Sequence, residues 1–391
     1  MEKITSIVDG DIADTEIVNA FDIEYLCCDG RYAFVGYVNK GGRMLVSCPK
    51  HFMYRDDEDI KLIIQCIIKS FRQTDKGSTD YIDCNIPFRA YLHILDYYYK
   101  HGLYMQATQV YRQGFSGKID WNRTIRKSQK IISGDNLLFL PFEVKQIERK
   151  HTFIGECMRF VINDGYIQFG KYAGVGELID NEGYSYNFSD RKNIVKQLKE
   201  EEGKHFRDSE IQLIRTLMQY FKWEGSMTEK SFFVTQSFAL AWETMVNNYL
   251  NINYYGYEDT TERIIFKRNC YKYVFEKQTE YVETSDKQNH KFHVEYDHLS
   301  NCISDGRIIV FDSKYYNRIS ELNYKQVAYH YFLMNDARGN VKAGNSIING
   351  LILPTEGEYE SRVHLDRRNI DGVYIQEHYL NLREVMECFA N

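Results

Sequence analysis

Residues 294–316 read VEYDHLSNCISDGRIIVFDSKYY, and this stretch decides the fold of the C-terminal part of the chain. Asp305-Gly306 is a dipeptide typical of the two-residue turn that joins antiparallel strands. A turn at these two residues predicts a β-hairpin in which Ser304 faces Arg307. The apolar run IIVF at 308–311 is then the inner part of the second strand.

The register of this hairpin brings three charged side chains together. It places Leu299 opposite Asp312, and Asp297 opposite Lys314. Because side chains alternate between the two faces of a strand, Asp297, Asp312 and Lys314 are expected on one face. Asp305 is an alternative partner for Asp312, but a turn residue would lie ~20 Å away at ~3.3 Å per residue.

Two carboxylates on neighbouring strands suit a divalent cation, since Mg²⁺ prefers carboxylates and water as ligands, and Mn²⁺ is a possible substitute. A lysine beside them can orient the attacking water and stabilise negative charge. This combination points to phosphodiester hydrolysis. The plainer interpretation is a solvated strand face with a weak ion pair between Asp312 and Lys314.

The elements around the hairpin predict a mixed α/β or α+β domain with one sheet. Helices are expected at 234–250, 321–334 and 382–389, and strands at 263–275, 291–303, 308–316, 346–353 and 372–379. In the first half, a hairpin is expected at 32–47, and helices at 56–71, 87–101 and 190–222, the last broken near Gly203. We therefore expect an N-terminal α+β region at 1–225 and a second domain at 226–391.

Composition excludes several classes of protein. The 391 residues carry 49 Lys and Arg against 55 Asp and Glu, so the net charge is −6 and no global basic surface for nucleic acid is present. Nine cysteines show no CxxC or zinc spacing, which is typical of reduced thiols in a cytoplasmic protein. No segment is apolar enough to predict a membrane span or a signal peptide. GKYAGVG at 170–176 lacks phosphate-loop spacing and predicts a loop, so no nucleotide is expected on this chain.

One local segment is strongly basic. Residues 117–130 contain a single acid, Asp120, and an interleaved Trp121, together with Lys118, Arg123, Arg126, Lys127 and Lys130. Such a cluster can contact DNA phosphates or an acidic partner surface. A solvated basic loop is the alternative.

The order of these motifs resembles a known nuclease family. The hairpin resembles the PD-(D/E)xK nuclease core, and the longer pattern is similar to the nuclease subunit of McrC/LlaJI-type restriction systems. The matching residues are Trp242-Glu243, Asp312-Ser313-Lys314-Tyr315-Tyr316 and Lys325-Gln326-Val327-Ala328-Tyr329. The resemblance covers residues 230–391 well and reaches SCPKHF at 47–52 and GKIDWNRTIRK at 117–127. Tyr296-Asp297 stands where the family usually has Pro-Asp.

The resemblance implies roles for five residues. Asp297, Asp312 and Glu243 would bind Mg²⁺, with Glu243 acting directly or through a water, and Lys314 would position the attacking water. Gln326 would lie near the site or the DNA backbone, although a plain surface amide is an equal alternative.

The resemblance also implies a restriction endonuclease subunit that cuts duplex DNA together with a McrB-like AAA+ GTPase, which the N-terminal region would engage. Three other functions stay open at this point: a stand-alone homodimeric restriction enzyme, a non-catalytic regulator of a partner GTPase, and a nuclease of repair or RNA processing.

Overall fold

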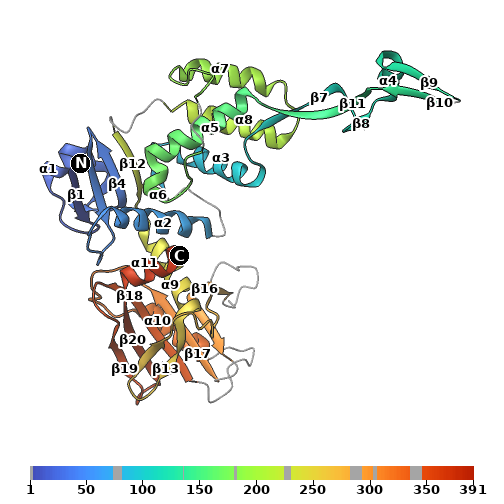
Figure 1. Cartoon of the computed structure of the whole chain (residues 1–391). Coiled ribbons are helices and arrows are strands. Elements are labelled where there is room, and N and C mark those ends of the chain that lie inside the picture. Colours follow the sequence, from blue (N-terminus) through green and yellow to red (C-terminus); the bar gives the residue numbers. More distant parts are fainter. Residues whose placement is uncertain are drawn as a thin grey trace, which may run out of the picture. The chain divides into compact units, whose positions relative to one another are not determined.

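The structure is a computed structural model that describes residues 3–73, 82–134, 136–179, 183–223, 230–281, 293–302, 306–334 and 346–391 (Figure 1). The chain forms two compact units. The first comprises residues 1–86, 172–174 and 225–391, and the second comprises residues 87–171 and 175–224. The functional division at residue 225 stays a prediction.

The first unit contains a five-stranded sheet of order β1-β5-β4-β12-β6. The expected hairpin is confirmed as β4 (Val35–Lys40) and β5 (Arg43–Cys48), which pair antiparallel. β1 (Lys3–Val8) pairs parallel with β5, and β12 (Lys230–Thr235) pairs antiparallel with β4 and with β6 (Asp83–Cys84). A strand from beyond residue 225 therefore completes the N-terminal sheet.

Helix α2 (Asp57–Gln73) lies where the sequence predicts a helix. Three acids occupy its first turn, where they complement the helix dipole. The isoleucines at the expected spacing are buried, namely Ile60, Ile63, Ile64, Ile67 and Ile68. α2 packs against α9 (Phe238–Asn253) and α11 (Leu382–Ala390). Its buried stripe thus belongs to the core of the first unit.

The second unit is a group of helices with a long β arm. The expected helix at 87–101 is α3 (Phe88–His101), and the pair around Gly203 is α7 (Arg191–Glu202) and α8 (Asp208–Phe221). The segment 153–165 forms α5 (Phe153–Gly165). The spacing of its apolar residues in the sequence does not decide between helix and strand. Residues 171–173 form a short helix, α6 (Lys171–Ala173), where a loop is expected.

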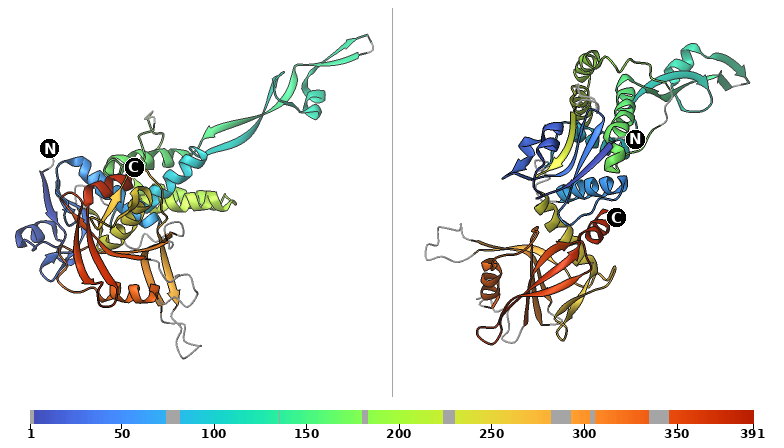
Figure 2. Two further views of the ribbon diagram at one scale, coloured as in Figure 1. Left: turned by 90° about the horizontal axis from the view of Figure 1, so that it is seen from below. Right: turned by 90° about the vertical axis from the view of Figure 1, so that its left-hand side faces the viewer.

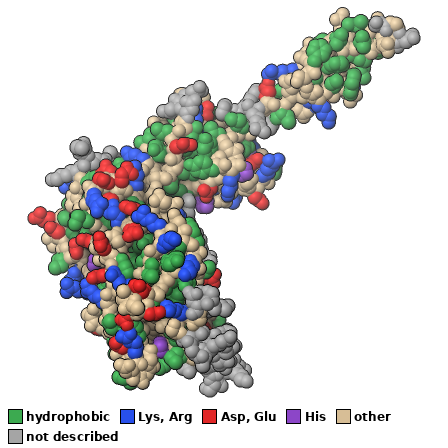
Figure 3. Space-filling model, turned by 60° about the horizontal axis from the view of Figure 1, so that its bottom comes forward, with side chains coloured by type: hydrophobic (Ala, Val, Ile, Leu, Met, Phe, Trp, Pro, Cys, Tyr) green, Lys and Arg blue, Asp and Glu red, His purple; other side chains and the backbone are tan. Residues whose placement is uncertain are grey.

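The arm consists of β7 (Met105–Gly114) and β11 (Phe142–His151), which pair antiparallel along ten residues each (Figures 1 and 2). Its outer end carries β8 (Lys118–Ile119), α4 (Trp121–Lys127), β9 (Gln129–Ser133) and β10 (Asn136–Leu140). Hydrophobic side chains gather on the surface of this arm (Figure 3).

The C-terminal half of the first unit is built on a six-stranded mixed sheet, which confirms the expected mixed α and β class. Its order is β15-β16-β17-β18-β20-β19. β17, β18 and β20 run parallel, and the other neighbouring strands pair antiparallel. The strands are β15 (Glu276–Tyr281), β16 (His293–Cys302), β17 (Arg307–Ser313), β18 (Ser346–Thr355), β19 (Glu360–Arg367) and β20 (Val373–Asn381).

Two helices cover opposite faces of this sheet. Val310 packs in an apolar cluster with Tyr329 and Leu333 of α10 (Tyr324–Met334). Its neighbour Phe311 points to the other face, where its ring lies 6.1 Å from that of Tyr254, the residue directly after α9. α9 contacts β16 and β17 on that face, beside the hairpin of β13 (Tyr254–Glu258) and β14 (Arg263–Phe266). The hairpin of β16 and β17 thus lies between two helices.

Within the described residues, no helix is both long enough and apolar enough to cross a membrane.

Candidate nuclease site

The hairpin of β16 and β17 has a different register from the predicted one. Leu299 pairs with Val310, and Cys302 pairs with Arg307, so the connection spans residues 303–306 instead of two residues. The predicted pairing of Leu299 with Asp312 is therefore wrong. The predicted pairing of Asp297 with Lys314, which depended on the same register, is wrong as well. The shift equals two residues, and an even shift leaves each side chain on its face of the strand. Asp305, the alternative acid, lies outside the described residues.

A β-bulge in β16 lies directly at Asp297. On the neighbouring strand, Glu276 pairs with Leu299 and Gln278 pairs with Tyr296. Asp297 and His298 therefore both stand opposite the single residue Lys277. A bulge bends its strand and re-aims the side chains within it, and bulges are common beside active sites.

The two predicted aspartates meet at the end of β17. Asp312 is completely buried, and Asp297 is 8% exposed. The Oδ2 atom of Asp297 accepts a hydrogen bond from the backbone N–H of Ser313 at 3.3 Å. The carboxylate of the upstream strand thus contacts the backbone next to Asp312.

Two lysines pair with these carboxylates. The ammonium of Lys314 forms an ion pair with Oδ2 of Asp312. Lys325, in the first turn of α10, lies 3.0 Å from Oδ1 of Asp312 and 3.7 Å from Oδ1 of Asp297. Lys325 is the main site residue to which the sequence analysis assigns no role. The sequence feature that could have drawn attention to it is a lysine near the start of a helix, where the helix dipole disfavours a positive charge.

The two carboxylates have opposite pKa shifts. Burial raises the pKa of Asp297 to about 7, and the negative charges of Asp312 and Glu243 add to this effect. Burial also acts to raise the pKa of Asp312, but Lys314 and Lys325 outweigh it and hold that pKa below its ordinary value. The pair therefore favours one firmly ionised carboxylate and one that holds its proton near neutrality.

Glu243 lies on α9 and is one-quarter exposed. Its Oε1 atom is 3.0 Å from Nζ of Lys277, and the same ammonium lies 2.8 Å from Oε1 of Glu295. Glu243 is also close enough to raise the pKa of Asp297. The structure thus brings Glu243 to the edge of the acidic pair, with Lys277 and Glu295 as neighbours that the sequence did not suggest.

A buried histidine, His298 on β16, contacts both α9 and β17 on the face of the sheet opposite the two aspartates. The Nδ1 atom of His298 lies 3.1 Å from Oδ1 of Asn247 on α9, and its Nε2 atom lies 2.7 Å from Oγ of Ser313. Burial lowers the pKa of His298 to about 3, so its ring is neutral. His298 connects α9 to the strand that carries Asp312.

Gln326 follows Lys325 on α10 and is completely buried, which excludes the surface amide considered above. Its backbone carbonyl accepts a hydrogen bond from Nδ2 of Asn349 at 2.9 Å. Neither atom of its side-chain amide has a hydrogen-bond partner among the described residues. Gln326 therefore lies between α10 and β18, next to the site.

The residues after Lys314 contact the SCPKHF segment. The hydroxyl of Tyr315 accepts a hydrogen bond from the backbone N–H of Lys50 at 2.7 Å, and Nε2 of His51 lies 3.4 Å from the carbonyl oxygen of Tyr316. His51 has a left-handed backbone, with φ of 63°. The N-terminal sheet therefore contacts the strand end that carries the site.

The basic residues of the segment 117–130 belong to the second compact unit. Lys118, Arg126 and Lys127 are exposed, and the last two lie in the final turn of α4. The guanidinium of Arg123 stacks 3.4 Å above the ring of Tyr111. These residues form part of the arm, and they lie among its exposed hydrophobic side chains.

The protein side chains would supply only some of the ligands of a divalent cation, and water would supply the others. Within the described part of the chain, no three Asp, Glu, His or Cys side chains converge as a complete metal cluster. Asp297 and Asp312 direct their Oδ1 atoms at one positive charge, that of Lys325. Two carboxylates with several waters is the ligand set that Mg²⁺ commonly takes. The residues present fit such a cation.

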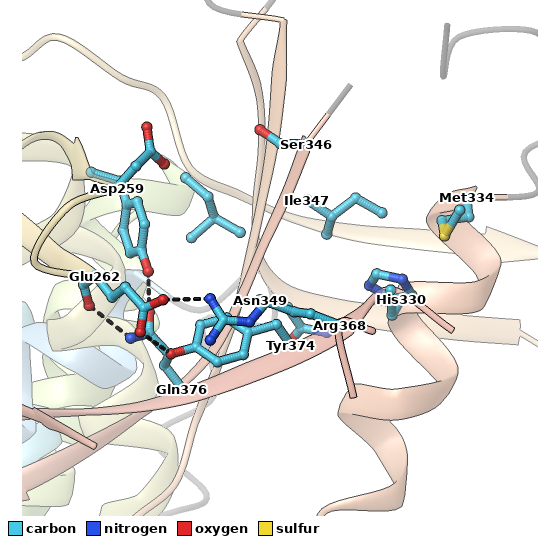
Figure 4. A pocket seen from close by; sticks show the side chains of 13 residues that line it. Asp259, Glu262, His330, Met334, Ser346, Ile347, Asn349, Arg368, Tyr374 and Gln376 are labelled. Atoms are coloured by element: carbon cyan, nitrogen blue, oxygen red, sulfur yellow. Dashed lines mark hydrogen bonds and ion pairs between the residues drawn. The ribbon is translucent and has the colours of Figure 1, made fainter. Parts of the chain in front are cut away.

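A separate cavity of about 380 Å³ opens near the start of β18 and β20 (Figure 4). Figure 4 shows Glu262 joined to Arg368 and Tyr374 at this cavity. None of the predicted site residues lines it. It therefore offers no support for the predicted chemistry.

Comparisons with known proteins give the family. No curated protein matches the chain. Two chains from McrBC structures of Thermococcus gammatolerans are similar at low identity. One, from an assembly of McrB AAA+ hexamers with bound McrC, is 13% identical over 99% of this chain and 98% of that chain, with a TM-score of 0.37. The other, from the cryo-EM structure of the McrBC complex, is 14% identical over 66% of this chain and 90% of that chain, with a TM-score of 0.26.

The sequence profile of the LlaJI restriction endonuclease family matches residues 34–371, which is most of the chain and includes both the acidic pair and the arm. The chain belongs to the LlaJI restriction endonuclease family.

Proposed function

We propose that this chain is a Mg²⁺-dependent endonuclease subunit with a PD-(D/E)xK site that hydrolyses phosphodiester bonds of duplex DNA, in the cytoplasm, as part of a restriction system that defends against phage. One observation carries the proposal. Carboxylates from neighbouring strands, Asp297 and Asp312, share one ammonium, and Lys314 pairs with the second oxygen of Asp312. Family membership supports it.

The residues divide the work as follows. Asp297 and Asp312 would hold Mg²⁺, and Glu243 would complete the site, directly or through a water. The cation, when bound, supplies a positive charge that stabilises a phosphoryl oxygen and acidifies a water. Lys314 orients the attacking water and stabilises the negative charge that develops on the phosphate. His298 positions Ser313, and through it the end of β17.

We also propose that the chain works with a McrB-like AAA+ GTPase, which engages the N-terminal region through the arm. The arm exposes large apolar side chains, which soluble proteins seldom gather in one place unless a partner covers them. They are Phe115, Trp121, Ile125, Ile132, Leu137, Leu138 and Ile147. The basic residues Lys118, Arg123, Arg126 and Lys127 would contact acidic groups of that partner, or DNA phosphates, at the rim.

The test is cleavage of a plasmid and phage DNA panel with Mg²⁺. Wild type is compared with Lys314→Ala and with Lys272→Ala, a lysine whose ammonium bonds the carbonyl of Tyr255. Each is assayed alone and with the product of the neighbouring gene plus GTP. We expect cutting by wild type and Lys272→Ala only with the partner, and none by Lys314→Ala.

Other outcomes identify the rival functions. Cutting by wild type without partner or GTP would indicate a stand-alone homodimeric enzyme. No cutting by any protein, with folding and partner binding intact, would indicate a non-catalytic subunit that stimulates the GTPase.

A further inference from the structure

Lys325 stands in an unusual place for a lysine. It is in the first turn of α10, where the helix dipole already concentrates positive charge. No acidic residue lies in that turn to offset it. Its compensation comes from outside the helix, from the two aspartates of the hairpin.

The position of the Lys325 ammonium is that of a bridging cation. It contacts Oδ1 of Asp312 at 3.0 Å and Oδ1 of Asp297 at 3.7 Å, so one positive charge faces the nearest oxygens of both carboxylates. Lys314 differs, since it pairs with the other oxygen of Asp312, and no ion pair to Asp297 is described for it. Two buried acids this close repel each other unless a cation lies between them.

We propose that Lys325 occupies the place of the divalent cation between Asp297 and Asp312 in the metal-free protein, and that it must leave when the metal binds. This inference rests on the proposed function of the same site. Two positive charges cannot share the bridging position. The Lys325 side chain is 46% exposed, against 18% for Lys314, so it has a solvent path for leaving.

The exchange sets the metal affinity of the site. Mg²⁺ must displace an ammonium that already neutralises the acids, so the wild-type protein binds Mg²⁺ more weakly than its two carboxylates alone would. The same ammonium keeps the acidic pair together when no metal is bound. The Lys325 ammonium already lies 5.3 Å from the centre of the Tyr329 ring. That ring face can hold the displaced ammonium beside the site.

The experiment measures Mg²⁺ binding to the full chain by isothermal titration calorimetry, without DNA. Four proteins are compared: wild type, Lys325→Met, Lys325→Arg and Lys272→Met. We expect Lys325→Met to bind Mg²⁺ about tenfold more tightly than wild type, because a competing charge is gone. Lys325→Arg keeps the charge and should stay near wild type, as should Lys272→Met. A merely structural lysine would produce the opposite change, namely weaker binding in Lys325→Met.

A second readout uses stability. Without metal, Lys325→Met should melt at a lower temperature than wild type, because its buried carboxylates lose their counter-charge. Added Mg²⁺ should raise its melting temperature by more than it raises that of wild type, in line with the tighter binding.

The outcomes separate this inference from the proposed function. Unchanged or weaker Mg²⁺ binding by Lys325→Met, while wild type binds Mg²⁺ and cuts DNA, would overturn the inference alone. A wild-type protein that neither binds Mg²⁺ nor cuts DNA under any condition would overturn the proposed function itself, and the inference with it.

Discussion

The Nε2 atom of His298 lies 2.7 Å from Oγ of Ser313, so the residue after Asp297 is joined to the residue after Asp312 on the opposite face of the sheet. The same ring reaches Asn247 on α9, one helical turn after Glu243. One neutral side chain thus fixes the relative positions of the three elements that carry the acids. Because neighbouring residues of a strand point to opposite faces, Asp297 serves one face of the sheet and His298 the other.

We expect His298→Ala to lower the cleavage rate by ~100-fold, because a displacement of about 1 Å in a reacting group can have an effect of this size. It would also leave Oγ of Ser313 and Oδ1 of Asn247, both half-buried, without their shared partner. The loss is about 1 kcal/mol for each group, the lower end of the range for buried groups. Rates are measured per folded molecule, with folding checked by circular dichroism. Ser313→Ala keeps the contact between His298 and Asn247, so its cleavage rate should fall by less than that of His298→Ala. A folded His298→Ala protein with the wild-type rate would remove the positioning role.

The buried ion pair of Asp59 and Arg383 provides a stability prediction. Asp59 on α2 is 3% exposed, and both of its carboxylate oxygens accept from Arg383 on α11. Arg383→Met should lower the free energy of unfolding by about 3–5 kcal/mol, because it leaves an unpaired buried charge.

A matched variant supplies the control for Arg383. Arg362→Met breaks the pair with Glu360, in which both side chains are largely exposed, and should change stability by less than ~1 kcal/mol. Urea unfolding measures both. If Arg383→Met changes the free energy of unfolding as little as Arg362→Met does, the α2–α11 contact depends on packing and not on charge.

The elements that the sequence predicted well are those with a strong local signal. α2 and α9 follow from the spacing of apolar residues, and β4 and β5 from a turn with two adjacent glycines at 41 and 42. The convergence of Asp297, Asp312 and Lys314 could be anticipated because an even register shift preserves the faces of a strand.

The remaining features depend on contacts between distant segments. The bulge at Asp297 arises in the pairing of β16 with β15, which no local pattern reveals. The register of β16 with β17 leaves a four-residue connection where Asp305-Gly306 predicts a two-residue turn. Lys325 reaches the acids only because α10 returns across the end of β17. The arm of β7 and β11 alternates too weakly to be read as strands from residues 105–114 and 142–151 alone.

His378 allows a prediction on pH. It is completely buried on β20, and burial, helped by the positive charge of Arg263, lowers its pKa to about 3. In the unfolded chain an ordinary histidine pKa is ~6.5, so between these values the unfolded state binds the additional proton. The stabilising contribution is therefore complete above pH ~6.5 and is lost as the pH falls, by ~1.4 kcal/mol per pH unit.

The measurement is the free energy of unfolding between pH 7 and pH 5 for wild type and His378→Asn. The variant keeps a polar group near the hydroxyl of Tyr359, which lies 3.0 Å from Nδ1 of His378. Its stability should fall less steeply on acidification than that of wild type. Parallel curves for the two proteins would contradict a neutral buried histidine at this position.

The arm supplies a prediction that separates partner binding from catalysis. Ile132 on β9 is 79% exposed and Leu138 on β10 is 47% exposed. Ile132→Asp with Leu138→Asp places two charges in an apolar surface that we expect the GTPase partner to cover, so partner binding and partner-dependent cleavage should fall at least ~100-fold. Mg²⁺ binding should not change, because the proposed metal ligands belong to the other compact unit. Phe206→Asp is the control, since Phe206 is 91% exposed in the same unit but lies outside the arm. A double variant that still binds the GTPase like Phe206→Asp would place the partner surface elsewhere in the N-terminal region.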